Sequence, residues 1–322
     1  MKELDFLKII AETLDDSSFI GNDCAYLDEF GLFVTQDTLV EDVHFSTYTT
    51  NAYLLGRKSV SVNLSDLAAA LAKPLYISVS LSMPKMIKNS FVENFYKGVN
   101  DVCREYGVKV IGGDITSSEK ITISVCAIGK KVSDFLTGRN KAKNGNYIVV
   151  TGNFGASGAG LYALQNFLYV EDDIKNSHLN PTPRINESLE TAKILTSDIA
   201  VMDTSDGLAD ALYKISLSSK HSIEVDFDKI PVKQEVVGFA KRNNLSIDDF
   251  VLWGGEDYEL VMCVDEETYS KLNSNNFKCI GKVLNKDNFP TVTVKHKRGS
   301  EKISSENFEE KSFNHFGVKL DD

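Results

Sequence analysis

The stretch KVIGGDITSSEKITISVCAIG, residues 109–129, contains the clearest strand signal in the chain. Residues 120–128 alternate apolar and polar side chains, which is typical of a strand with one buried face. Just before it, the apolar run 108–111 predicts a short buried strand that ends in a turn at Gly112, Gly113 and Asp114. An amphipathic pattern over 91–106 predicts a helix, and Gly107 suits its C-terminal cap. A helix between strands favours a mixed α/β unit.

The same unit extends toward the N-terminus. Residues 31–36 predict a strand that ends near Asp37, and 76–81 predict another. Residues 54–72 place apolar side chains at near-helical spacing, so we expect a helix that Pro74 stops. The polar stretch 137–146 loses this periodicity and marks a domain boundary. With 322 residues, the chain is long enough for two domains, which we place at 1–136 and 137–322.

The second half also reads as α/β. A buried strand leads into a glycine-rich turn and helix (152–164), and the segment 180–184 is a rigid connection. Further helices are expected at 184–195 and 207–218, and strands at 147–151, 200–203, 223–227, 259–264 and 279–283.

Composition narrows the class of protein. Hydrophobic residues make up 42% and charged residues 25%, an ordinary globular balance. The net charge of −11 argues against a nucleic-acid partner, because no basic stripe could neutralise phosphates. No apolar run is long enough to span a membrane, and the first residues lack a signal-peptide pattern, so we expect a cytoplasmic protein without a membrane partner. The five cysteines form no CxxC pair, which gives no support to a zinc or disulfide framework.

Aspartates recur beside glycines and small residues, mostly where predicted strands end. Because strand ends meet at a sheet edge, we expect these carboxylates to converge. Such oxygen ligands suit Mg²⁺, and like charges this close need cations to be stable. The segments are Gly21-Asn22-Asp23, Thr35-Gln36-Asp37, Ser65-Asp66, Gly112-Gly113-Asp114 and Asp203-Thr204-Ser205-Asp206-Gly207.

Taken singly, most of these positions also fit a simpler role. Asp206 could cap a helix, and Asp114 could be a turn residue. Asp66 is harder to explain this way, because an unpaired charge buried in its apolar helix would cost on the order of 3–5 kcal/mol.

Two glycine-rich segments could also approach a ligand. In 253–260, two glycines precede Glu256 and Asp257, which either project into a cleft or form a solvated turn. The turn at 152–160 follows a strand and opens a helix, as a phosphate cradle does, but it matches neither the Walker nor the dinucleotide fingerprint. Arg139 could bind a phosphate or lie on the surface, and His44 stands near an acidic segment.

These motifs, in this order, resemble the thiamine-monophosphate kinase family of the aminoimidazole ribonucleotide synthetase-like superfamily. The resemblance runs from residue 21 to 316. The motifs that carry it are IGNDCAYL (20–27), VTQDTLVEDVHF (34–45), GRKSVSVNLSDLAAALAKP (56–74), IGGDIT (111–116), TGR (137–139), VTGNFGASGAGL (150–161), PTPR (181–184), MDTSDGL (202–208), WGGEDYEL (253–260) and FNHF (313–316).

The resemblance implies an α/β (α+β) fold of two domains and a homodimer paired through N-terminal mixed sheets. It implies ATP and several Mg²⁺ ions as co-substrate and cofactor, with thiamine monophosphate as phosphoryl acceptor. Metal positions carry over to Asp23, Thr35, Gln36, Asp37, Asp66, Asp114, Asp203 and Asp206, of which Asp114, Asp203 and Asp206 would be catalytic. Nucleotide contacts carry over to Tyr96, Gly113, Asp114, Arg139 and Ser205, and substrate contacts to His44, Glu256, Asp257 and Phe313.

Asn22 and Gln36 depart from the family pattern, which usually has Asp and then Thr or Ser there. Both are neutral oxygen donors, so we expect metal binding to persist. Two phosphorylated substrates bring about six negative charges into an acidic site, so Mg²⁺ must bridge them. The acceptor phosphate has a second pKa near 6, so direct in-line transfer needs no strong base and no phosphoenzyme.

Two other functions compete with this one. A synthetase of the same superfamily, such as a selenophosphate synthetase, would carry a reactive cysteine in a glycine-rich N-terminal segment, whereas the first cysteine here is Cys24, inside an aspartate motif. A non-catalytic nucleotide- or metal-binding regulator would have lost several aspartates, yet all six metal-position aspartates are present.

Overall fold

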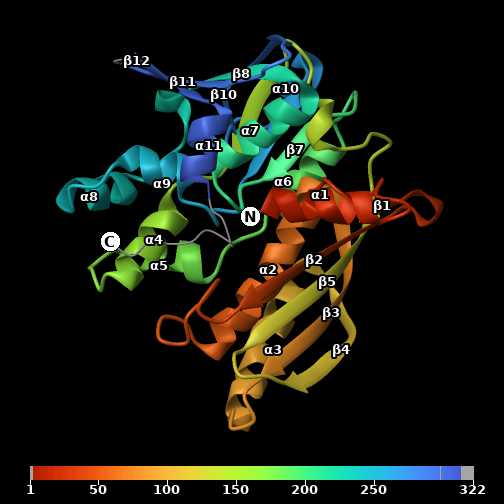
Figure 1. Ribbon diagram of the computed structural model, residues 1–322, viewed down its shortest axis with the longest axis vertical. Helices are drawn as coiled ribbons and strands as arrows, with labels where there is room; N and C mark the ends of the chain where they lie inside the picture. The colour runs from red at the N-terminus through yellow and green to blue at the C-terminus, as the bar shows by residue number, and fades with distance from the viewer. Residues whose placement is uncertain (1–2, 298, 313–322) are drawn as a thin grey trace.

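The computed structural model describes residues 3–297 and 299–312, which build two sheets with helices packed around them (Figure 1). The first sheet is mixed and has the strand order β1-β2-β5-β3-β4, with only β3 and β4 parallel. Its strands are β1 (Ala25–Leu27), β2 (Leu32–Val40), β3 (Ala72–Met83), β4 (Lys109–Ser117) and β5 (Thr122–Lys131).

Two helices, α2 (Ala52–Ala69) and α3 (Asn89–Tyr106), pack on one face of this sheet (Figure 1). They approach closely because Gly56 and Gly98 stand at their contact. A Cβ on Gly56 would lie 2.0 Å from the carbonyl oxygen of Phe95, and one on Gly98 would lie 2.0 Å from that of Tyr53. The opposite face of the sheet carries small polar side chains such as Ser80, which is exposed, and Ser124.

The second sheet has seven strands in the order β12-β11-β8-β10-β6-β9-β7, antiparallel except for β8 and β11. Its strands are β6 (Tyr147–Thr151), β7 (Ala200–Asp203), β8 (His221–Asp226), β9 (Leu260–Val264), β10 (Phe277–Lys286), β11 (Val292–His296) and β12 (Gly299–Ile303). The remaining helices are α1 (Glu3–Thr13), α4 (Ala156–Gln165), α5 (Asp172–Leu179), α6 (Ile185–Ala192), α7 (Leu208–Ser219), α8 (Gln234–Arg242), α9 (Ile247–Trp253), α10 (Glu266–Lys271) and α11 (Ser305–Lys311).

One of the buried apolar clusters spans both sheets. Leu67 of α2 belongs to the same buried cluster as Val201 of β7 and Met262 of β9. Helix α2 also contacts α6 and β7, so it lies between the first sheet and the second half of the chain. The boundary placed after residue 136 falls in the sequence between the two sheets, while the core is continuous across it.

Several predicted elements are confirmed with close bounds. The alternating stretch 120–128 is β5, and 147–151 and 200–203 are β6 and β7. Gly107 ends α3 in the left-handed conformation, with φ of 69°. Within the described residues, no helix is both long and apolar enough to cross a membrane.

Pro74 was expected to end a helix, and this was wrong. Helix α2 ends at Ala69, and Pro74 lies inside β3, where the pairing with β5 shifts register between Pro74 and Tyr76. A proline lacks the N–H that a regular ladder needs, and an irregularity in the pairing tolerates it. Strand β2 likewise does not end near Asp37 but continues through it to Val40.

The strand predicted over 108–111 is present from residue 109, but its predicted burial and the turn predicted at 112–114 were wrong. Strand β4 runs from Lys109 to Ser117, forms an edge of the sheet and is exposed along its whole length. Asp114 therefore lies within the strand, paired with Ser80, and is not in a turn. Gly113 is required by the pairing, because a Cβ there would lie 1.8 Å from the carbonyl oxygen of Val79.

Candidate metal and phosphate site

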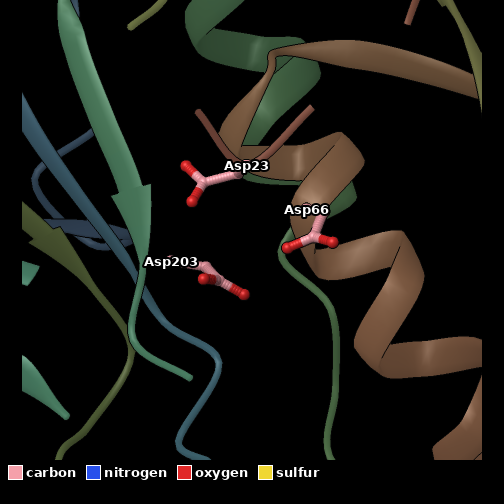
Figure 2. Close-up of side chains that lie close together, drawn as sticks. All are labelled: Asp23, Asp66 and Asp203. Carbon is pink, nitrogen blue, oxygen red and sulfur yellow. The ribbon is translucent and has the colours of Figure 1, made fainter. Parts of the chain in front are cut away.

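Three carboxylates from distant parts of the chain meet between the two sheets (Figure 2). Asp23 comes from the loop before β1, Asp66 from α2, and Asp203 from the end of β7. Each offers an oxygen atom, and these oxygens lie within 4.8 Å of one another. The convergence expected from the sequence is thus present for these three aspartates.

Helix α2 and strand β2 fix this group through hydrogen bonds. The Thr35 hydroxyl donates to Asp66 Oδ2 at 2.5 Å. The Ser65 hydroxyl donates to Asp203 Oδ2 at 2.6 Å. The backbone N–H of Asp37 donates to Asn63 Oδ1 at 2.9 Å, which ties β2 to the same helix. These bonds orient the acids before any ligand arrives.

Burial and mutual repulsion raise the pKa values of these acids. The pKa of Asp203 rises to about 7, because of burial and then the charge of Asp23. Burial and Asp206 raise the pKa of Asp37 to about 6, and burial and Asp37 raise that of Asp66 well above its usual value. A carboxylate oxygen cluster of this kind fits Mg²⁺, because a divalent cation would remove the repulsion that holds the pKa values up.

Asp206 lies beside this group, in the turn that opens α7. Lys214 reaches it at 3.1 Å and also reaches Asp210 at 2.8 Å. Burial raises the pKa of Asp210 to about 6, although Lys214 opposes the shift. Sequence reasoning missed Asp210 and Lys214, whose spacing of four residues on a helix is the signal that could have found them.

Arg139 lies against the same acids. Its terminal nitrogen donates to Asp23 Oδ1 at 2.6 Å. Its Nε is buried, and no acceptor for it exists among the described residues. A cavity of about 300 Å³ is lined in part by Asn22, Asp23 and Gly138, the residue before Arg139. A buried guanidinium donor left without an acceptor suits a phosphate oxygen.

The glycine-rich turn 152–160 does not offer an open phosphate cradle. Both carboxylate oxygens of Asp257 occupy the start of α4, accepting from the backbone N–H of Gly155 at 2.7 Å and of Ser157 at 3.0 Å. Glu259 accepts from Thr151 and forms a buried ion pair with Arg184. The chain's own acids thus take the position that an anionic ligand would need, so the cradle interpretation was wrong.

Glu256 points elsewhere and joins three segments. Its backbone N–H donates to the carbonyl oxygen of Ser205 at 2.7 Å. Its carboxylate contacts Lys58 of α2 at 2.9 Å and His178 of α5 at 3.0 Å. Sequence reasoning missed both partners. Lys58 is a buried cation in the same helix as Asp66, and a charge placed between apolar residues was the available signal.

Some expected site residues lie away from the acids. Asp37 shares a register row with Val125, Val79 and Gly113, so Gly113 is three strands distant, about 14 Å. Asp114 is next to Gly113 on that far edge. The Gln36 side chain projects from the opposite face of β2 and donates to the Ser124 hydroxyl at 3.2 Å, so it does not join the acids.

The remaining expected residues have other local settings. His44 follows β2, and its Nδ1 accepts from the backbone N–H of Val40 at 3.0 Å. Tyr96 lies on α3, edge-on to Phe95 at 5.4 Å between ring centroids. Phe313 lies outside the described residues.

The N-terminal part of the chain matches a class of proteins related to aminoimidazole ribonucleotide synthetase. The family model "AIR synthase related protein, N-terminal domain" matches residues 21–130. Within that class, the chain is 34% identical over 275 residues to the thiamine-monophosphate kinase of Aquifex aeolicus, covering 83% of this chain and 87% of the relative. It is 32% identical to that of Bacillus subtilis, covering 84% and 86%.

Solved structures agree with these relatives. A structure described as AaThiL complexed with AMPPCP and TMP matches with a TM-score of 0.85 and 31% identity, over 98% of this chain and 97% of that one. The hydrogenase maturation protein HypE in complex with ATP, at 20% identity and a TM-score of 0.71, shares the fold alone. The chain belongs to the thiamine-monophosphate kinase family.

Proposed function

We propose that this protein transfers the γ-phosphoryl group of ATP to the phosphate of thiamine monophosphate. The products are ADP and thiamine diphosphate. The observation that carries the proposal is the meeting of Asp23, Asp66 and Asp203 in a chain of this family. Membership of the thiamine-monophosphate kinase family identifies the reaction. The three acids provide a place where two phosphorylated substrates could be held together.

The transfer is direct. An oxygen of the acceptor phosphate attacks the γ-phosphorus, a new P–O bond forms, and the bond from the γ-phosphorus to the β,γ-bridging oxygen breaks as ADP leaves. The acceptor oxygen is largely deprotonated at neutral pH, because the second pKa of a phosphate monoester is near 6. No side chain therefore needs to act as a strong base or to carry the phosphoryl group.

The acids of the site fit Mg²⁺ by their chemistry, being oxygen donors held close together. Asp23, Asp66 and Asp203 would hold the ions, with Asp37 and Asp206 beside them. Bound Mg²⁺ supplies neutralisation of phosphate charge and alignment of the two substrates. The part played by the chain is to keep these carboxylates in place, through Thr35 and Ser65.

Arg139 and Ser205 would contact the nucleotide, and His44 and Glu256 the thiamine end of the acceptor. The free Nε of Arg139 supports the first assignment. Asp257 is assigned to capping α4, where it accepts from the backbone N–H groups of Gly155 and Ser157. Glu256, whose side chain is 23% exposed, is the acid that would face the acceptor.

We further propose that the working form is a homodimer. Gly113 and Asp114 lie on the exposed edge strand β4, on the far side of the sheet from Asp23. Within one chain they do not reach the acids, whereas a second copy docked on the open face of the sheet could present them. In this arrangement residues 1–136 bind ATP and pair with the partner, while residues 137–322 complete the site.

The dimer can be tested by mixing two inactive variants. Asp114→Asn and Asp203→Asn would each be inactive alone, but a mixed dimer contains one site with both aspartates intact. Random mixing after dissociation should restore about one quarter of wild-type activity. No recovery, from a sample shown by light scattering to contain mixed dimers, would contradict a shared site.

The reaction itself is tested with purified protein, ATP, MgCl₂ and thiamine monophosphate, by measuring thiamine diphosphate. We expect multiple turnovers that stop when EDTA is added. Formation of ADP only with some other acceptor would overturn the assignment and favour a synthetase of the same superfamily. A covalent phosphoprotein on the reaction path would overturn direct transfer.

A further inference from the structure

Lys58, Glu256 and His178 form a buried charged triad that the acidic site does not include. Lys58 Nζ lies 2.9 Å from Glu256 Oε1, and His178 Nδ1 lies 3.0 Å from Oε2. The Lys58 and His178 side chains are only 4% and 6% exposed, while that of Glu256 is 23% exposed. Lys58 and His178 are thus shielded from solvent, whereas the Glu256 carboxylate is partly exposed.

The triad is held rigidly with respect to the metal-site acids. Lys58 and Asp66 lie on the same helix, eight residues apart, which is about 12 Å along its axis. Glu256 itself is fixed by its N–H bond to Ser205 and by a left-handed backbone, with φ of 55°. One helix therefore sets the spacing between the phosphate end and the Glu256 end of the site.

The partners of Glu256 determine its charge. Burial alone would raise the pKa of Glu256, but Lys58 and His178 outweigh it and lower the pKa to about 2. Burial and Lys58 lower the pKa of His178, although Glu256 opposes the shift, and the neutral ring can donate to Glu256 through Nδ1. Its Nδ1 also lies 3.2 Å from the Ser157 hydroxyl. The triad holds the positive charge of Lys58 and the negative charge of Glu256. The partly exposed Glu256 carboxylate is the part of the triad that a ligand can reach.

We propose that Lys58 and His178 are positioning residues that hold the Glu256 carboxylate ionised and turned toward the cationic thiazolium of the acceptor. This rests on the proposed function, in which Glu256 lies at the thiamine end. A carboxylate facing a permanent cation favours that acceptor over a neutral one. Without Lys58, the buried carboxylate would lose its compensating charge and its fixed direction.

The test compares steady-state constants of variants that remove single members of the triad. Lys58→Met and Glu256→Gln should each raise the KM for thiamine monophosphate about tenfold or more, with the KM for ATP changed less than about twofold. The double variant should be no worse than Glu256→Gln alone, because Lys58 acts through Glu256.

Arg57→Gln is the matched control. Arg57 directly precedes Lys58 on α2, and its side chain donates to Asn180 at 2.7 Å and to Glu105 at 2.9 Å. It removes a contact between α2 and the second half of the chain, so it should lower the melting temperature and leave the KM for thiamine monophosphate unchanged.

His178 gives an independent test should Lys58→Met not fold. His178→Leu removes the Nδ1 donor and should raise the KM for thiamine monophosphate. His178→Asn keeps an N–H near the same place, so its KM should be close to that of wild type. The positioning role is overturned if the KM for thiamine monophosphate stays unchanged in both Lys58→Met and His178→Leu, as it should in the Arg57→Gln control. An unchanged KM in Glu256→Gln overturns the thiamine contact itself, and absence of thiamine diphosphate from the wild type overturns the reaction.

Discussion

Replacing Asp203 by asparagine should make the metal-free protein more stable while removing its activity. Asp203 is 2% exposed, and burial together with Asp23 raises its pKa from 3.8 to about 7. Asparagine keeps an oxygen that can accept from Ser65 but carries no charge. The substitution therefore removes repulsion from the folded state at little cost in packing.

The magnitude follows from the shift. Each pKa unit corresponds to about 1.36 kcal/mol, so a shift of about three units gives about 4 kcal/mol as an upper value. Because neighbouring acids share the repulsion, we expect a gain of about 2 kcal/mol. The raised pKa means that the folded chain binds more protons than the unfolded chain between about pH 4 and 7. Stability of the wild type therefore falls as pH rises through that window.

Thermal unfolding in EDTA measures this directly. At pH 7.5 the variant should melt a few degrees above wild type, and the difference should vanish near pH 4. With MgCl₂ and ATP the order should reverse, because only wild type keeps the full ligand set. A variant that is less stable in EDTA at pH 7.5, with the same response to MgCl₂ as wild type, would refute the reasoning.

Asp265→Asn is a control for which the expected change in stability has the opposite sign. Burial works against ionisation of Asp265, but hydrogen bonds from Thr268, Ser197 and Thr196 outweigh it and lower its pKa to about 2. The stability it contributes is present above pH 4 and is lost as pH falls toward 2. Its substitution should therefore lower the melting temperature at pH 7.5, with or without EDTA.

Three further substitutions test other parts of the account. Asp206→Asn should abolish thiamine diphosphate formation while leaving the circular dichroism spectrum and melting temperature near wild type; a matched loss of both would indicate a structural role. Arg184→Met should cost about 3–5 kcal/mol in urea unfolding, because it strands the buried carboxylate of Glu259, which is 3% exposed. Gly152→Ala should cost at least about 2 kcal/mol by the same measurement, since φ is 47° and the new Cβ would lie 1.9 Å from Glu259 Oε1; stability within 0.5 kcal/mol of wild type would contradict this packing.

The sequence predicted strands well where apolar and polar side chains alternate, or where a short apolar run is buried on both faces. The alternation over 120–128 and the apolar runs at 147–151 and 200–203 correspond to β5, β6 and β7. Edge strand β4 was misjudged, because an apolar run such as Val110-Ile111 looks alike whether or not anything covers it. Pro74 was misjudged because a shift in strand register cannot be seen in one strand's sequence.

The sequence predicted that aspartates form the metal site, but it did not predict correctly every residue that belongs to the site. Asp23, Asp66 and Asp203 were found because aspartates near strand ends were expected to converge, and because a charge buried in an apolar helix, as at Asp66, is costly without a partner. Gln36 was placed wrongly with them, since a period of two puts its side chain on the other face of β2 from Asp37.

Individual side-chain pairings between distant segments could not be predicted. Asp257 caps α4, a helix that begins about a hundred residues earlier, and Lys58 pairs with Glu256 from the other end of the chain. Both contacts depend on how the second half of the chain packs on α2, which no local pattern encodes.

A structure of the protein with Mn²⁺, a non-hydrolysable ATP analogue and thiamine monophosphate tests the central claim most directly. Anomalous scattering from Mn²⁺ should place ions about 2.1 Å from oxygens of Asp23, Asp66 and Asp203, and within reach of oxygens from both substrates. Ions bound elsewhere, with these three carboxylates contacting neither metal nor phosphate, would contradict it.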